Sequence, residues 1–228
     1  MNENYFILLL AGSGSRLYDK IHMKKQFYPL RGKEMFLYPL KSAVESSLFS
    51  RIVLVVDEED RTKVTDILNR EFPGNDFKIA VGGKDRNESV GNGLALLKNT
   101  AKENAYVFIH DSDRVLLSSS FLRELEEKVR GYDALTPVLD LHDSILKEER
   151  DRIEYLDRNG VKLIQTPQVF LYFKIQEIYE NGYDKQDTDD FKKAVAAGLR
   201  VRTVPGVYEN FKVTTIDELS LIQRIFDH

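Results

Sequence analysis

Short apolar runs alternate with segments of helical periodicity along most of the chain, and this alternation constrains the fold more than any other feature. Strands are predicted at residues 5–10 (YFILLL), 51–56, 77–81, 106–110, 134–139 and 200–205. Helices are predicted at 34–49, 60–72, 89–102 and 118–130, after Phe170, and from Thr215 onward. Because strands joined through helices form right-handed crossovers, the pattern predicts an α/β fold with a doubly wound, mostly parallel sheet.

The bulk composition narrows the classes of protein that this fold can serve. With 228 residues, 42% hydrophobic and 31% charged, and without internal repeats, the chain is typical of one soluble globular domain, 1–228. A net charge of -4 argues against nucleic acid as a partner, and no apolar run approaches the roughly 18 residues of a membrane span. The absence of cysteine excludes disulfides and thiolate metal sites and is compatible with a reducing compartment. With neither a signal peptide nor a membrane span expected, cytoplasmic is the default expectation.

The segment from Asp143 to Val169 departs from the alternating pattern. It contains two short apolar stretches on either side of a charged turn, which predicts a β-hairpin or protruding arm. An isolated hairpin is only marginally stable in water, so its apolar side chains need a covering surface. Two identical arms packed across a two-fold axis would provide one, and a homodimer is expected.

Four polar segments follow predicted strands, at the edge where α/β sheets bind ligands. They are AGSGSR (11–16), VDEED (56–60), GGKDR (82–86) and HDSDR (110–114). The first is neither a Walker P-loop nor a complete G-x-G-x-x-G motif, and a tight turn would also explain its glycines. However, a small-residue loop exposes backbone N–H groups, and Arg16, Lys24 and Lys25 add positive charge, which favours a phosphate.

The HDSDR segment offers the best candidates for metal ligands. Asp111 and Asp113 are two residues apart, so in an extended chain both carboxylates can face the same way. Mg²⁺ takes few protein carboxylates and completes its shell with phosphate oxygens and water. A pair of solvated loop acids is the alternative. His110 is expected to pack against a helix rather than to bind metal, and Ser89 to cap the helix that follows it.

Taken in order, the motifs resemble one enzyme family across nearly the whole chain. The matching stretches are LLLAGSGSRL, KKQF, GGKDRNESV, HDSDR, the Asp-Ser of HDSILK, DRNGV with QTPQVF, TDD and NFKVTT. They resemble the 2-C-methyl-D-erythritol 4-phosphate cytidylyltransferases and their ribitol-5-phosphate relatives. The resemblance implies a Rossmann-like fold of the nucleotide-diphospho-sugar transferase type. It also implies Mg²⁺-dependent transfer of a cytidylyl group from CTP to a sugar-alcohol phosphate, with release of pyrophosphate, for isoprenoid precursor synthesis.

The resemblance also implies roles for individual residues. The implied catalytic cations are Arg16, Lys25 and Lys212, and the metal ligand is Asp111. The implied nucleotide-binding residues are Ala11, Gly12, Ser13, Gly14, Gly83, Asp85 and Ser89. The implied acceptor-binding residues are Arg114, Ser144, Thr166 and Arg158, of which Arg158 would reach the partner subunit's site.

Departures from the family pattern leave two alternatives open. Lys24 and Val115 stand where the family has proline, and Asp113 stands where it has a small residue. One alternative is a different acceptor, such as ribitol 5-phosphate or another polyol phosphate for cell-wall or capsule polymers. The other is a non-catalytic nucleotide-binding relative whose site is spoiled by Asp113 and Lys24.

Overall fold

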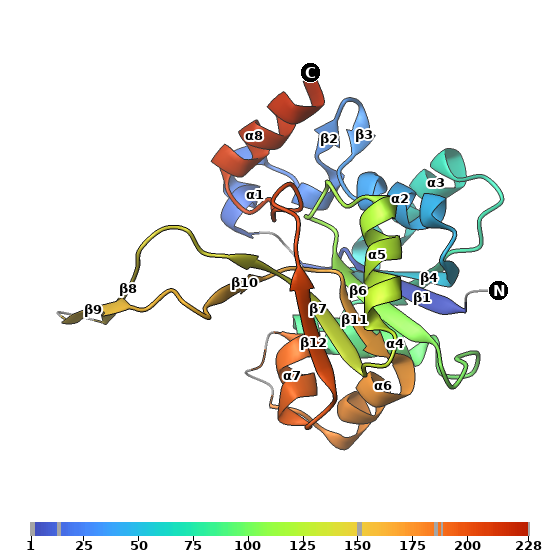
Figure 1. The fold of residues 1–228 in the computed structure, drawn as a ribbon. Coiled ribbons are helices and arrows are strands. Elements are labelled where there is room, and N and C mark those ends of the chain that lie inside the picture. The colour runs from blue at the N-terminus through green and yellow to red at the C-terminus, as the bar shows by residue number, and fades with distance from the viewer. Residues whose placement is uncertain (1–2, 13–14, 150–151, 185–186, 188, 228) are drawn as a thin grey trace.

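A mixed sheet of eight strands forms the central layer of the molecule. The structure is a computed structural model that describes residues 3–12, 15–149, 152–184, 187 and 189–227. The strands follow the order β10-β7-β11-β6-β1-β4-β5, and β12 also pairs with β7 (Figure 1). They are β1 (Asn4–Leu9), β4 (Phe49–Val56), β5 (Lys78–Val81), β6 (Tyr106–Asp111), β7 (Ala134–Asp140), β10 (Lys162–Ile164), β11 (Gln168–Leu171) and β12 (Val201–Pro205). The pairs of β1, β4, β5 and β6 are parallel, and the predicted fold class is confirmed.

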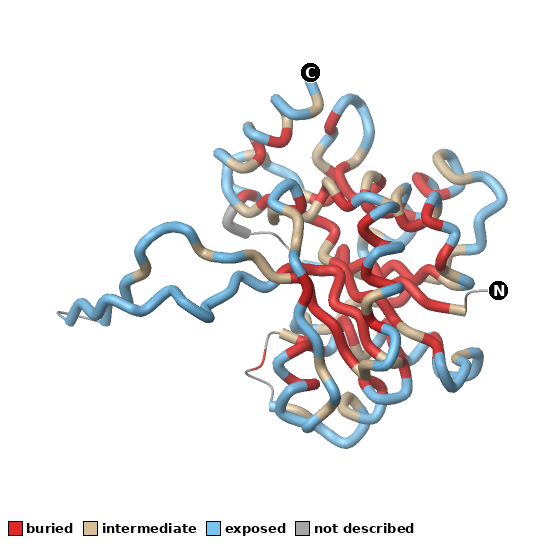
Figure 2. Tube along the Cα trace, in the orientation of Figure 1, coloured by how far each residue is buried: buried red, intermediate tan, exposed pale blue. Residues whose placement is uncertain are grey.

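Helices cover both faces of the sheet. One face packs against α2 (Leu37–Ser46), α3 (Arg61–Glu71) and α5 (Ser119–Val129), and the other against α4 (Arg86–Ala95), α6 (Tyr172–Asn181) and α7 (Asp190–Ala196). Successive residues of β1 serve the two faces in turn, since Phe6 and Leu8 join the first core whereas Tyr5 and Ile7 join the second. A strand buried on both faces is apolar throughout, which explains the unbroken YFILLL run. Figure 2 shows this burial concentrated in the sheet.

A smaller apolar cluster closes the molecule beside the sheet. It contains side chains of α1 (Ser15–Ile21), of β2 (Pro29–Leu30) and of α8 (Ile216–Asp227). The short strand β3 (Lys33–Glu34) pairs with β2. Short 3-10 turns at Lys25–Phe27 and Glu58–Asp60 complete the regular elements. None of the described helices is both long and apolar enough to cross a membrane.

Side-chain caps fix where several helices begin. A capping box precedes α8: the Glu218 N–H donates to Thr215 Oγ1 at 3.2 Å and the Thr215 N–H donates to Glu218 Oε2 at 2.8 Å. Ser118 caps α5 by accepting from the N–H of Phe121 at 3.1 Å. The predicted cap at Ser89 is wrong. Asp85 caps α4 instead, accepting from the Glu88 N–H at 2.8 Å, so the helix begins three residues earlier than predicted.

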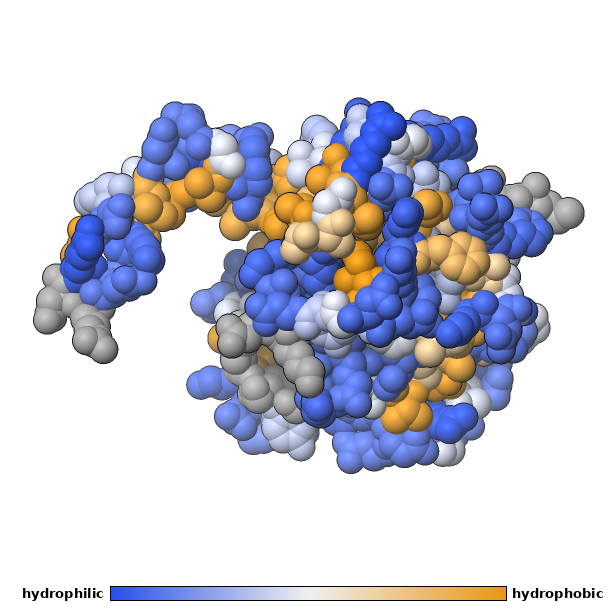
Figure 3. Space-filling model, turned by 90° about the horizontal axis from the view of Figure 1, so that it is seen from below, coloured by the Kyte–Doolittle hydropathy of each residue, from blue (hydrophilic) through white to orange (hydrophobic). Residues whose placement is uncertain are grey.

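A β-hairpin projects from the body as an arm (Figure 1). It consists of β8 (Ile145–Glu149) and β9 (Arg152–Leu156), which pair antiparallel. Large apolar or aromatic side chains lie exposed along it, including Leu146, Ile153 and Tyr155. Figure 3 shows hydrophobic residues among the hydrophilic ones on the arm. The predicted carboxyl-terminal boundary of the arm, Val169, is wrong, because β10 pairs with β7 and β11 inserts between β7 and β6 in the central sheet. Buried Val169 and Phe170 therefore belong to the core.

Candidate active site

A cleft of about 190 Å³ lies at the carboxyl ends of β1 and β6. Both strands are parallel, so the loops that follow them meet at the same edge of the sheet. The cleft is lined by Leu9, Leu10, Ala11, Gly12, Lys25, Gln26, Arg86, Asp111, Ser112, Asp113 and Lys212. Three of the four segments singled out in the sequence thus meet in one place, together with a lysine from the chain's last sixth.

The glycine loop forms one wall of this cleft. The Ala11 N–H donates to Val55 O at 2.8 Å, and the side-chain amide of Gln26 donates to Leu10 O at 2.8 Å. Gly12 has a φ of +122°, a conformation that favours glycine, and its N–H lies 3.3 Å from both carboxylate oxygens of Asp57. A carboxylate therefore sits on a backbone donor of this loop, which is consistent with a loop that attracts anions.

Three residues predicted for this loop cannot be placed fully. Ser13 and Gly14 lie outside the described residues. Arg16 falls within α1, and its side chain also lies outside the described part. Their assigned roles in nucleotide binding and catalysis stay predictions.

The GGKDRNES loop approaches the glycine loop closely. A Cβ on Gly82 would lie 2.4 Å from the Cβ of Ala11, and a Cβ on Gly83 would lie 2.2 Å from the Glu88 side chain. The Gly83 N–H donates to Ser89 Oγ at 3.0 Å, and that hydroxyl donates to Asp85 O at 2.9 Å. Asp85 and Ser89 therefore shape the loop, and their contacts to a nucleotide stay predictions.

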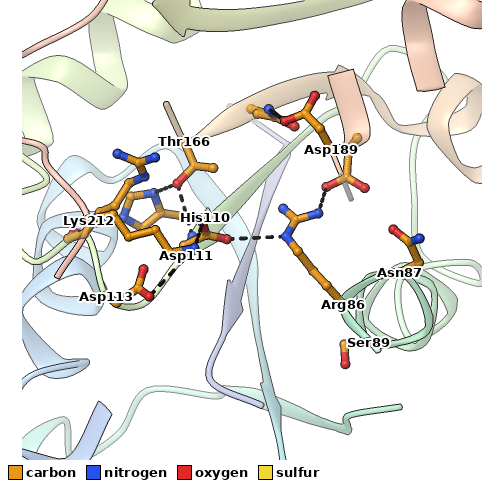
Figure 4. Close-up of polar contacts among 12 residues, drawn as sticks. Arg86, Asn87, Ser89, His110, Asp111, Asp113, Thr166, Asp189 and Lys212 are labelled. Carbon is orange, nitrogen blue, oxygen red and sulfur yellow. Dashed lines mark hydrogen bonds and ion pairs between the residues drawn. The ribbon is translucent and has the colours of Figure 1, made fainter. Parts of the chain in front are cut away.

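Asp111 ends β6 at the centre of the cleft (Figure 4). Lys212 Nζ lies 2.9 Å from Asp111 Oδ2, and Arg86 Nε lies 3.6 Å from Oδ1. Burial by itself would raise the pKa of this carboxyl group, but Arg86 and Lys212 outweigh burial and hold the pKa well below its usual range. Asp111 is thus an ionised carboxylate at neutral pH.

His110 and Thr166 support Asp111 from behind. The His110 ring is fully buried, with Nδ1 2.9 Å from Thr166 Oγ1 and Nε2 3.2 Å from Arg114 O. Burial lowers the pKa of His110 to about 4, so the ring is neutral at pH 7. The Asp111 N–H donates to Thr166 Oγ1 at 3.2 Å. His110 is buried, as expected, but its ring nitrogens contact Thr166 and Arg114 rather than a helix. Thr166 is buried too, and its role in acceptor binding stays a prediction.

Asp113 faces the same cleft as Asp111. Its side chain is only 8% exposed, and Lys25 Nζ forms an ion pair with Oδ2. Lys25 also donates to Val213 O at 3.2 Å, while Lys212 Nζ lies 3.8 Å from Asp113 Oδ2. The second oxygen of Asp113, Oδ1, has no hydrogen-bond partner in the described part of the chain. Two predicted catalytic lysines therefore converge with two carboxylates.

A second layer of charged residues lies behind the cleft, and the sequence did not predict it. Arg86 NH1 lies 2.7 Å from Asp190 Oδ2, and Asp190 is fully buried at the start of α7. The hydroxyl of Tyr179 donates to Asp190 Oδ1 at 2.5 Å, and buried Lys193 lies 3.4 Å from the same oxygen. Arg86 thus links α7 to Asp111 (Figure 4). The available signal was an arginine three residues after the glycine pair Gly82-Gly83, which follows the carboxyl end of β5.

The remaining acceptor-binding candidates lie outside the residues that line the cleft. Arg114 donates to Asn210 O at 2.9 Å and to Ile164 O at 3.4 Å. Ser144 is exposed at the base of the arm, and Arg158 is exposed just beyond β9, where it contacts the carbonyl oxygen of His142. Within one chain, the structure does not bring Ser144 and Arg158 to the cleft.

Lys24 also lies outside the cleft, where three carboxylates surround its ammonium group. Its ammonium is 2.8 Å from Asp57, 2.5 Å from Glu59 and 2.7 Å from Asp60. Burial alone would lower the pKa of Lys24, but the hydrogen bonds that it donates to Asp57, Asp60 and Glu59 outweigh burial and raise the pKa. The side chain is 17% exposed, so Lys24 ties the glycine-loop region to the end of β4.

We expect Lys24→Ala to lower the free energy of unfolding by about 1–2 kcal/mol, because three neighbouring carboxylates would lose their shared cation and repel one another. Urea denaturation at pH 7 measures the change. Lys20→Ala, at an exposed position of α1, is the control and should change stability by less than about 0.5 kcal/mol. Equal stability of the two variants would contradict a structural role for Lys24.

Comparison with known proteins agrees with this geometry. The sequence model of the family described as 2-C-methyl-D-erythritol 4-phosphate cytidylyltransferase matches residues 5–228. Proteins of that name from Thermotoga neapolitana and Clostridium botulinum (strain 657) are 33% and 31% identical to the chain over 222 and 231 residues, which covers 97% and 100% of this chain and 96% and 99% of those proteins.

A solved structure shows that the fold is shared. The structure titled 4-diphosphocytidyl-2C-methyl-D-erythritol synthase from Anaerococcus prevotii matches with a TM-score of 0.82 at 23% identity, covering 100% of this chain and 99% of that one. These findings confirm the resemblance that the sequence motifs carry. The chain therefore belongs to the 2-C-methyl-D-erythritol 4-phosphate cytidylyltransferase family of enzymes.

Proposed function

We propose that this chain transfers a cytidylyl group from CTP to 2-C-methyl-D-erythritol 4-phosphate, producing the CDP-alcohol and pyrophosphate for isoprenoid precursor synthesis. Family membership supports the activity and both substrates. The observation that carries the proposal is the cleft itself. There the ionised carboxylate of Asp111 stands among Lys25, Lys212 and Arg86, beside the backbone of Gly12.

The cleft supplies what nucleotidyl transfer needs. The reaction requires in-line positioning and positive charge around oxygens that gain charge, with little covalent help from protein. The acceptor phosphate is already an anion, so it attacks the α-phosphorus of CTP without a general base, and pyrophosphate leaves. Lys25 and Lys212 stabilise the charge that develops on the α-phosphate oxygens. Arg16, in the first turn of α1, is proposed to do the same for the leaving pyrophosphate.

We further propose that the cleft holds Mg²⁺ through Asp111. The fit rests on donor chemistry: Mg²⁺ prefers hard oxygen ligands, Asp111 is ionised, and buried Asp113 Oδ1 has no partner among the described residues. When bound, the ion neutralises part of the charge on the nucleotide phosphates. Arg86 and Thr166 keep Asp111 in place by an ion pair and by a backbone hydrogen bond.

The arm is proposed to serve a homodimer. Leu146 pairs with Tyr155 across the hairpin, and Ile153 lies on the same face opposite Glu148, so three large apolar side chains are exposed on one face of the arm. Burying that face against a second copy would remove it from water. Arg158 would then contact the acceptor phosphate in the neighbouring subunit, and Ser144 would bind the acceptor. Action in the cytoplasm stays a prediction.

A pyrophosphate-release assay tests the proposed function. With Mg²⁺ and CTP, we expect release only with 2-C-methyl-D-erythritol 4-phosphate, and not with ribitol 5-phosphate. Replacing CTP with ATP, GTP or UTP should abolish most of the signal. Release with ribitol 5-phosphate alone would reassign the acceptor, and no release with any pair of substrates would favour the non-catalytic alternative.

A further inference from the structure

Only one of the two carboxylate oxygens of Asp113 has a partner among the described residues. Lys25 pairs with Oδ2, but Oδ1 has less than 1 Å² exposed and no hydrogen-bond partner among the described residues. The side chain as a whole is 8% exposed. Leaving a buried charged oxygen without a partner is costly, and native proteins rarely do so without a reason. The ion pair with Lys25 satisfies Oδ2 of Asp113, and Oδ1 remains available to a ligand.

Asp113 and Asp111 face each other across one ammonium group. Lys212 Nζ lies 2.9 Å from Asp111 Oδ2 and 3.8 Å from Asp113 Oδ2, so one cation already bridges the two carboxylates. Both residues line the same cleft, with the glycine loop on its wall. A divalent cation bound between them would have two carboxylate ligands and room for phosphate oxygens and water, which is the usual coordination of Mg²⁺ at nucleotide sites.

We propose that Asp113 is a second protein ligand, beside Asp111, for the divalent cation of the proposed cytidylyl transfer, and that Lys25 and Lys212 hold the two carboxylates until the cation binds. This inference rests on the proposed function. Lys25 and Lys212 are then free to turn to the nucleotide phosphates. A bound cation would also neutralise Asp113. Without a cation, this carboxylate would repel the triphosphate of the nucleotide.

Binding of Mn²⁺, followed by the electron paramagnetic resonance signal of the free ion, tests the proposal without any turnover. We expect Asp113→Asn to weaken Mn²⁺ binding by at least about 10-fold, as the loss of a direct ligand should cost no less than the loss of an outer partner. Asp76→Ala, which removes a carboxylate that is 79% exposed on a surface loop, is the matched control and should bind Mn²⁺ like the wild type.

Lys25→Met provides a second measurement that leaves Asp113 intact. Because Lys25 competes with the cation for Asp113, the variant should bind Mn²⁺ more tightly than the wild type. If Asp113 only positions Lys25, Asp113→Asn will leave Mn²⁺ affinity unchanged, and the proposal is overturned. Unchanged or weaker binding by Lys25→Met also overturns it, and this arm remains decisive if Asp113→Asn fails to fold.

A CTP titration in EDTA separates this inference from the proposed function. Without metal, Asp113→Asn should bind CTP at least as tightly as the wild type, since a negative charge has left the cleft. With Mn²⁺ present, the order should reverse. The same order with and without metal counts against Asp113 as a ligand. Failure of the proposed function would instead appear as no binding of CTP by the wild type, while the Mn²⁺ titrations without nucleotide still report on Asp113.

Discussion

Lys212→Ala is expected to lower turnover by about 10²–10³-fold while changing the KM for CTP far less. The ammonium of Lys212 lies 2.9 Å from Asp111 Oδ2. Asp111 is the proposed metal ligand, and the α-phosphate of CTP is proposed to bind beside it. Burial alone would lower the pKa of Lys212, but Asp111 and Asp113 outweigh burial and raise it, so the charge persists across neutral pH. A charge placed where the transition state gains negative charge acts on kcat more than on binding. Steady-state pyrophosphate release measures both parameters.

Two further variants sharpen this test. Lys98→Ala removes an exposed lysine whose only recorded ion pair, among the described residues, is with Glu180, and it should leave kcat unchanged. Lys212→Arg keeps the charge but changes its shape, so partial recovery is expected. A rise in KM with kcat intact for Lys212→Ala would mean that Lys212 binds the ground state, and would contradict the assigned role. Arg16→Ala is expected to behave like Lys212→Ala, on the strength of the family resemblance.

The sequence predicted the half of the sheet that contains β1, β4, β5 and β6. The central strands β1, β4 and β6 carry long runs of buried apolar residues, and the edge strand β5 is a shorter apolar run. The sequence also predicted the location of the cleft, since the loops after parallel strands meet at one edge. It did not predict the insertion of β11 between β6 and β7. That pairing joins Val169 to Phe108 across about sixty residues, and a four-residue strand carries no local signal of its partner.

The candidate site was predicted in part for a similar reason. Motif positions identified Lys25, Asp111 and Lys212 as a group, and the structure brings them together. Arg86 was quoted within a motif but given no role, because its partners Asp111 and Asp190 come from distant segments. Lys24 and Asp113 both depart from the family pattern, and only the structure shows that they differ in location. Lys24 pairs with carboxylates outside the cleft, whereas Asp113 lines the cleft.

Mixing two inactive variants is expected to restore activity if the arms complete each other's sites. In one variant, Arg158→Ala, the arm loses its proposed contact to the acceptor phosphate. In the other, Lys212→Ala, the cleft loses a catalytic cation. A mixed dimer then contains one site with an intact cleft and an intact neighbouring arm. Random exchange should recover roughly a quarter of wild-type activity, because half of the dimers are mixed and each has one complete site.

The geometry of a single chain motivates this experiment. Arg158 is exposed beyond the hairpin, contacts the carbonyl oxygen of His142, and is not among the residues that line its own cleft. The exposed fractions of Ile153 and Tyr155 on the arm are 61% and 76%, far above those of core residues. A covering surface from a second copy would explain the apolar face and carry Arg158 toward a neighbouring cleft.

The controls decide between shared and separate sites. Different affinity tags on the two variants allow mixed dimers to be purified, which proves that subunits have exchanged before activity is measured. Mixing Lys212→Ala with a Lys25→Ala chain should restore nothing, because both substitutions lie in the cleft and every site would then lack one cation. Recovery in that control would discredit the assay. Purified mixed dimers of Arg158→Ala and Lys212→Ala that stay inactive, or a chain that is monomeric by light scattering at micromolar concentration, would refute the shared site.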